Sequence, residues 1–180
     1  MNDELNALFE ADREEHSNVP EFGTPAYIAL RERDRQRRER TTAIITLGGL
    51  QSAEDYYHAA KLFQHGDTPD DAWQAHTLAS KAAECGYRPA RWLSAAALDR
   101  WLMYQGKPQK YGTQYVWDGY RDRLWDVEQA TSDVERAEWD VPPLAEQLQK
   151  AVEASRNRSP SPVPENAPLW LKDALKRWQV

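Results

Sequence analysis

The chain has 180 residues, of which 41% are hydrophobic and 29% are charged, and its formal net charge at pH 7 is −6. This length fits one domain with a single hydrophobic core. The negative net charge argues against nucleic acid as a partner, because the summed field of the protein repels a polyanion. The one cysteine, Cys85, excludes an internal disulfide.

The sequence also predicts a cytoplasmic protein that does not enter a membrane. No charged segment followed by an apolar stretch occurs near residue 1, which is the pattern of a secretory signal. No run approaches the ~18 consecutive apolar residues that a membrane-spanning helix requires.

Five helices are predicted between residues 2 and 104. Thr24-Pro25 and Thr68-Pro69 each combine an N-cap residue with a proline at the first helical position, and glycines follow the helix ends. The predicted ranges are 2–16, 25–46, 53–65, 69–85 and 89–104. Small residues such as Ala75 and Ala79 allow close helix approach. We therefore expect a mainly α fold of antiparallel helix pairs, which resembles a bundle of Sel1-like or tetratricopeptide units, although no second copy recurs at a fixed period.

The C-terminal part of the chain has a different pattern. Aromatic and β-branched residues at 114–117 and 123–127 flank the turn pair Asp118-Gly119, which predicts a small β-hairpin. Short helices are expected at 132–138 and 143–154. We expect a single domain over 1–154, a Pro/Ser-rich linker over 155–168 and an amphipathic helical tail over 169–180. The tail must dock on its own domain, on a protein partner or on a second copy in a homodimer.

Six arginines lie between Arg31 and Arg40, interleaved with acidic residues. This segment could form an anion or RNA patch, or a solvated helix face that carries intrahelical ion pairs. We favour the ion pairs, because no aromatic residue is interleaved for base stacking.

Four sequence blocks resemble a bacterial family known as a domain of unknown function, marked by a Gln-His pair, an Asp-Arg pair and a Gly-Thr-Gln loop. The blocks are Tyr57-His58-Ala59-Ala60, Phe63-Gln64-His65-Gly66, Leu98-Asp99-Arg100 and Pro108-Gln109-Lys110-Tyr111-Gly112-Thr113-Gln114. The resemblance covers a third to a half of the chain. It singles out these residues and implies no reaction.

His58 and His65 are seven residues apart, which places them on one face of a helix but two turns apart. Metal-binding histidines on one helix usually lie four apart, so we predict no metal site and no cofactor. His65, beside Gln64, could stabilise the helix C-terminus or act as a general base. His58 could be a satisfied core histidine, and His16 and His76 are expected at the surface.

Asp99 and Arg100 interrupt an apolar run, so at least one of them should be buried and paired. Asp99 could orient His65, and Arg100 could hold a carboxylate or phosphate. The alternative is a buried ion-pair network that fixes helix packing.

The loop 108–114 is a further candidate, because loops on a rigid scaffold often carry function. Gln109, Tyr111, Thr113 and Gln114 offer donors and acceptors around Gly112. The alternative is a connector whose side chains bond backbone groups.

The sequence favours a small-molecule-binding α-helical protein. The polar residues discussed above suit metal-free acid/base chemistry on a small polar or anionic molecule. His58, His65 and Asp99 are the candidate catalytic residues. The alternative is a helical scaffold that binds a protein or peptide. The candidate ligand-binding residues are Gln64, Arg100, Gln109, Tyr111, Thr113 and Gln114.

Overall fold

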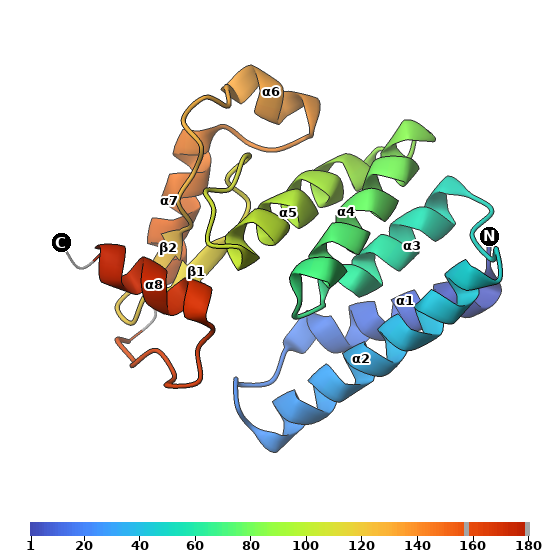
Figure 1. Ribbon diagram of the computed structural model, residues 1–180, viewed down its shortest axis with the longest axis horizontal. Helices are drawn as coiled ribbons and strands as arrows, with labels where there is room; N and C mark the ends of the chain where they lie inside the picture. Colours follow the sequence, from blue (N-terminus) through green and yellow to red (C-terminus); the bar gives the residue numbers. More distant parts are fainter. Residues whose placement is uncertain (157–158, 179–180) are drawn as a thin grey trace. The chain divides into compact units, whose positions relative to one another are not determined.

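The computed structural model describes residues 1–156 and 159–178, and it shows a mainly helical chain with a small two-stranded sheet, as predicted (Figure 1). The chain divides into two compact units, residues 1–94 and 95–180, with the boundary inside one helix rather than at the expected linker. In the described part of the chain, no helix is long and apolar enough to span a bilayer. The elements are α1 (Asp3–Glu15), η1 (His16–Asn18), α2 (Pro25–Thr46), α3 (Ala53–Gln64), α4 (Pro69–Glu84), α5 (Pro89–Tyr104), β1 (Tyr115–Trp117), β2 (Asp122–Leu124), α6 (Asp133–Glu138), α7 (Leu144–Ser155) and α8 (Leu169–Trp178).

Side-chain caps set the starts of the helices in the first unit. Thr24 Oγ1 accepts a hydrogen bond from the Tyr27 N–H, and Pro25 follows as the first helical residue of α2. Reciprocal capping boxes open α3, through Ser52 and Asp55, and α4, through Thr68 and Asp71. The helix starts predicted from the sequence are therefore confirmed, because the cap residues act locally.

The first unit is built around the pair α3 and α4, which lie side by side in Figure 1 with α1 packed against α3. Small side chains form this core, so that the helix backbones approach closely. The fully buried alanines on the two helices are Ala59, Ala60, Ala72, Ala75, Ala79 and Ala82. This confirms the predicted helix pairing.

The arginines of α2 form ion pairs rather than an open basic surface. Arg35 pairs with Glu32 and Glu39 on its own helix. Arg40 pairs with Glu4 of α1, and Arg38 lies 3.4 Å from Asp71 at the start of α4. The guanidinium groups of α2 therefore form ion pairs both within this helix and with the neighbouring helices α1 and α4.

The second unit has an aromatic core around Trp125, which is 1% exposed. Trp170 and Trp178 of α8 both pack edge-on against Trp125, each at a ring-centroid distance of 5.4 Å. The Trp125 Nε1–H donates to the Lys107 carbonyl at 2.7 Å, which satisfies the polar end of the buried indole. The predicted tail helix is thus docked on its own unit, while residues 179–180 lie outside the described part.

The hairpin differs from its prediction in one respect. Strands β1 and β2 are antiparallel, but a four-residue loop joins them, not the two-residue turn Asp118-Gly119. Asp118 Oδ1 accepts hydrogen bonds from the Tyr120 and Arg121 N–H groups, and this side-chain turn shifts the second strand start to Asp122.

Ser155 is the last residue of α7, and the other described residues of the expected linker, 156 and 159–168, form no helix or strand. Ser161 connects this segment to the hairpin. Its N–H donates to the Gly119 carbonyl at 3.1 Å, and its own carbonyl accepts from Trp117 Nε1 at 2.9 Å. The proline-rich segment therefore has a defined path beside the hairpin loop.

We predict that Trp170→Ala lowers the free energy of unfolding of the second unit by about 3 kcal/mol, because it removes an aromatic side chain packed against Trp125. Chemical denaturation followed by tryptophan fluorescence measures this. Tyr120→Ala, at a side chain 78% exposed on the same unit, should stay within about 0.5 kcal/mol of wild type. Equal costs for the two variants would show that α8 is not part of this core.

Candidate functional site

Asp99 is a structural anchor for the loop that follows α5. Its buried carboxylate accepts hydrogen bonds from the N–H groups of Lys110, Tyr111 and Thr113 at 2.7, 2.9 and 3.0 Å. The Thr113 hydroxyl donates a fourth bond at 2.8 Å. Burial raises the pKa of Asp99 by more than these hydrogen bonds lower it. The carboxylate is thus engaged within the second unit.

The two glutamines of the loop hold its ends together. Gln109 Nε2 donates to the carbonyls of Gln114 and Trp125, and Gln109 Oε1 accepts from the Gln114 N–H at 2.8 Å. The Gln114 amide donates to the Ala96 carbonyl and accepts from Arg100 Nε at 3.0 Å. These side chains mainly satisfy backbone groups, so the geometry matches the connector interpretation of this loop.

Tyr111 and Thr113 are buried with the loop, at 4% and 8% exposure. The Tyr111 ring packs against Trp139, and its carbonyl accepts a hydrogen bond from the buried Arg136 Nε at 2.9 Å. The predicted ligand-binding residues Arg100, Gln109, Tyr111, Thr113 and Gln114 therefore all belong to the second unit, whereas His58, Gln64 and His65 belong to the first.

His65 is paired with Asp12, not with Asp99 as the sequence suggested. It caps the C-terminus of α3, where its Nδ1–H donates to Asp12 Oδ1 of α1 at 3.0 Å. Its carbonyl accepts from Arg31 and Arg38 of α2 at 2.6 and 3.3 Å, and these cations suit the negative end of the helix dipole. His65 thus lies at the end of its helix, as one interpretation expected, and its carboxylate partner is Asp12.

The position of His16 differs from the prediction. It was expected at the surface, but its ring stacks on that of His65 with a centroid distance of 3.7 Å and an interplanar angle of 21°. Its Nε2–H donates to Asp34 Oδ1 at 3.1 Å. The turn of η1 directly after α1 carries the imidazole back into the unit. We call Asp12, His16, Asp34 and His65 the carboxylate–imidazole cluster.

The two carboxylates of this cluster are both 1% exposed but differ in their partners. Asp34 also binds Arg31 and Arg37, with N–O distances of 2.7 and 3.0 Å. Burial alone would raise the pKa of Asp34, yet the hydrogen bond and charge of His16, with the charge of Arg31, lower it overall. In contrast, Asp12 Oδ2 is buried with no hydrogen-bond partner among the described residues.

The cluster offers both proton-transfer and ligating groups. Burial lowers the pKa of His65 by more than the hydrogen bond to Asp12 raises it, which favours the neutral imidazole. A neutral ring that donates from Nδ1 presents a lone pair at Nε2. One ligand atom each from Asp12, His16 and His65 lies within 4.8 Å of the others, so these three residues could hold a metal ion.

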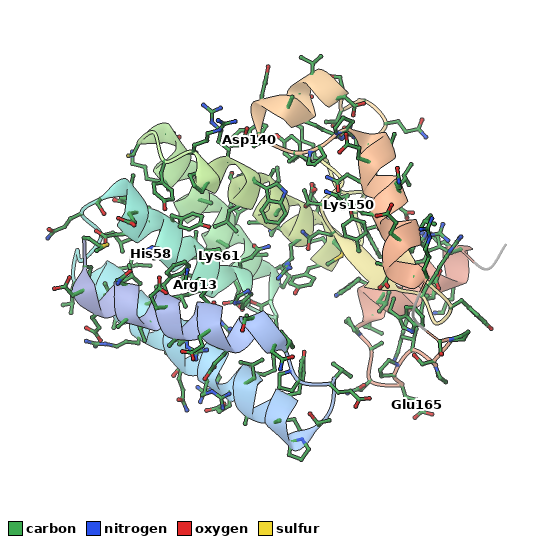
Figure 2. The ribbon with its side chains drawn as sticks, turned by 180° about the vertical axis from the view of Figure 1, so that it is seen from behind. Arg13, His58, Lys61, Asp140, Lys150 and Glu165 are labelled. Carbon is green, nitrogen blue, oxygen red and sulfur yellow. The ribbon has the colours of Figure 1, made fainter. Side chains whose placement is uncertain are left out.

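His58 belongs to the core of the first unit and not to the cluster. Its ring stacks on Phe9 of α1 at 4.1 Å with an interplanar angle of 9°, and Figure 2 labels it on α3 beside α1. Its Nδ1 is buried without a hydrogen-bond partner in the described chain, and burial lowers its pKa. Gln64 is buried at the last position of α3. His58 therefore acts as an aromatic packing residue.

His76 is also better connected than predicted. Its Nδ1 lies 3.0 Å from the Ser94 carbonyl and 3.1 Å from the Ser94 hydroxyl, and burial lowers its pKa. It is half-buried and joins α4 to the start of α5.

Comparison with protein-family models, with curated proteins and with solved structures found no match to this chain. The assignment of the site therefore depends on its geometry.

Asp99→Asn is expected to destabilise the second unit by about 3 kcal/mol, because an amide NH₂ would face backbone N–H donors and leave at least one unsatisfied. Urea denaturation at neutral pH measures the loss. Asp173→Asn, whose carboxylate is exposed in α8, is the control and should change stability by less than about 0.5 kcal/mol. If Asp99→Asn left the free energy of unfolding unchanged, Asp99 would not be the anchor of this loop.

His58→Phe should reduce the acid sensitivity of the first unit. The pKa of His58 is lowered in the folded state, so the unfolded chain binds more protons as the pH falls below about 6.5, and stability declines there. The phenylalanine keeps the stack on Phe9 without this proton uptake. We expect a shallower fall in the free energy of unfolding between pH 7 and pH 5, measured against Tyr57→Phe as the control. A slope equal to that of wild type would contradict the lowered pKa.

Proposed function

We propose that the protein binds a small polar or anionic molecule at the carboxylate–imidazole cluster and transfers a proton at this molecule. Asp12 takes the orienting role that the sequence assigned to Asp99, and His65 provides the nitrogen that exchanges the proton. His16 and Asp34 form the second pair, which stacks against the first. This arrangement suits hydrolysis, elimination or isomerisation.

The observation that carries this proposal is the unequal use of the two oxygens of Asp12. Oδ1 receives the hydrogen bond of His65, whereas Oδ2 has no partner in the described residues although it is buried. A buried carboxylate oxygen without a donor is destabilising and calls for an explanation, and a donor supplied by a bound molecule is one. A hydroxyl or amino group of a bound molecule would satisfy it.

The charge around the cluster favours molecules that bring a donor or a counter-ion. Arg31 and Arg37 are the guanidinium groups closest to the carboxylates, and both are already bound to Asp34. Arg37 also pairs with Glu15 at 2.5 Å. An anionic molecule therefore needs a further positive charge in the site, while a neutral polar molecule does not.

A scaffold for a protein or peptide is the second candidate. A groove in the second unit is lined by Leu124, Leu148 and Val152, with Arg121 and Arg123 at its border. Leu148 and Val152 are 52% and 60% exposed, which suits an apolar anchor of a peptide. The C-terminal tail is not this anchor, since its tryptophans pack against Trp125.

The proposal is tested by calorimetric titration with a panel of small polyols, amines, amino acids, carboxylates and phosphate esters. We expect at least one class to bind wild type and to bind Asp12→Asn and His65→Gln at least 10-fold more weakly, a difference of about 1.4 kcal/mol. Glu10→Gln, on the exposed face of α1, is the control and should bind as wild type does. Binding that ignores the Asp12 and His65 variants would place the site elsewhere, and a panel without any binder would contradict the proposal.

A further inference from the structure

Three potential metal ligands from two elements that are distant in sequence converge in the first unit. Asp12 and His16 are four residues apart at the end of α1, the spacing at which two side chains on one helical face can share an ion. His65 joins them from the end of α3, more than forty residues later in the chain. One ligand atom from each lies within 4.8 Å of the others. A single ion bonded at about 2.0–2.2 Å to each ligand requires this kind of convergence.

The unpartnered oxygen of Asp12 is a second, independent observation. The Asp12 side chain is 2% exposed, and its Oδ2 has no hydrogen-bond partner among residues 1–156 and 159–178. The guanidinium of Arg37 is 3.9 Å from the other oxygen, Oδ1, and is held by Asp34 and Glu15. Arg37 therefore approaches Asp12 less closely than it approaches Asp34 and Glu15.

We infer that Asp12, His16 and His65 bind one divalent transition-metal ion, with zinc as the class of ion that fits best. Two imidazole nitrogens and one carboxylate are a ligand set typical of catalytic zinc, and three protein ligands leave a position for water or a bound molecule. Asp34 Oδ1 accepts from His16 Nε2 at 3.1 Å, so His16 would bind the ion through Nδ1, with Asp34 orienting the ring, or the contact with Asp34 would have to break. The sequence prediction of no metal considered only His58 and His65 and missed the four-residue spacing of Asp12 and His16.

The ion would also change the stacked arrangement of the two rings. Imidazole lone pairs lie in the ring plane, and the two planes are now only 21° from parallel. Both lone pairs can point at one centre only after the rings turn out of the stack.

This inference rests on the proposed function, which it deepens by naming the source of positive charge. An ion in the cluster would attract an anionic molecule to a site that otherwise presents carboxylates. With the ion bound, the imidazole of His65 serves as a ligand, and ion-bound water becomes the proton donor or acceptor.

The test uses the full chain after treatment with EDTA and dialysis. Titration calorimetry with zinc chloride should give one ion per chain, and cobalt(II) should produce the visible absorption of an ion with four or five nitrogen and oxygen ligands. Asp12→Asn, His16→Ala and His65→Ala should each weaken zinc binding at least 100-fold. His76→Gln, which changes a histidine bound to Ser94, is the matched control and should bind zinc as wild type does. Circular dichroism checks that each variant is folded.

Two results would overturn the inference. The first is the absence of stoichiometric zinc or cobalt binding by folded wild-type protein. The second is binding that the three ligand variants leave unchanged while His76→Gln removes it. Calorimetry of the small-molecule panel with and without zinc separates this inference from the proposed function. Small-molecule binding at the cluster by protein that binds no zinc leaves the function and rejects the ion, whereas stoichiometric zinc without any small-molecule binder does the reverse.

Discussion

The burial of four aspartates is the constraint on which both units depend. Asp12, Asp34, Asp55 and Asp99 are each no more than 1% exposed. A carboxylate removed from water is strongly destabilising unless donors or cations replace its hydration. The position of each aspartate therefore dictates which other groups must lie around it.

Two of these carboxylates are satisfied by backbone and organise the chain. Asp55 accepts from the N–H groups of Asn2, Gln51 and Ser52, which connects the start of α1 to the start of α3. Asp99 accepts hydrogen bonds from the N–H groups of Lys110, Tyr111 and Thr113 in the loop 110–113. In both cases several N–H groups of an irregular segment converge on one side chain. These residues give their segments a defined conformation, and a structural role accounts for these hydrogen bonds.

Asp12 and Asp34 are instead satisfied by side chains, and this is why we assign function to them. Imidazole can exchange a proton, and both imidazole and guanidinium side chains can exchange partners without unfolding a loop, whereas backbone N–H groups cannot. Asp34 has a full set of partners in His16, Arg31 and Arg37. Among residues 1–156 and 159–178, the carboxylate of Asp12 has only the bond from His65 within normal hydrogen-bond distance, and its second oxygen has no donor there.

Much of the fold could be predicted because its signals are local. Thr24-Pro25, Ser52 with Asp55, and Thr68-Pro69 determine helix starts within four residues of themselves, so the sequence predicted these starts correctly. The hairpin loop was wrong in length because the Asp118 side chain forms a turn of its own.

The site was harder to predict because its contacts join distant parts of the chain. The sequence identified His65 as a helix-end residue or general base and expected Asp99 or Arg100 to be buried, but it could not show that a carboxylate 53 positions away would be the partner of His65. His16 looked like a surface residue because its only sequence neighbours are polar. The four-residue spacing of Asp12 and His16 was a usable signal, but the end of α1 lies outside the blocks that carry the family resemblance.

The most direct test of this account compares the free energies of unfolding of Asp12→Asn and Asp55→Asn in EDTA-treated protein at pH 7. Both residues are buried in the first unit, and each substitution removes one charge. Asp55→Asn should cost about 3 kcal/mol, because it disrupts bonds to several backbone N–H groups. Asp12→Asn should cost less than about 1 kcal/mol or stabilise the fold, because it removes the charge from a carboxylate whose Oδ2 has no hydrogen-bond partner in the described part of the chain. Equal losses would contradict the account, since Asp12 would then be a structural carboxylate like Asp55.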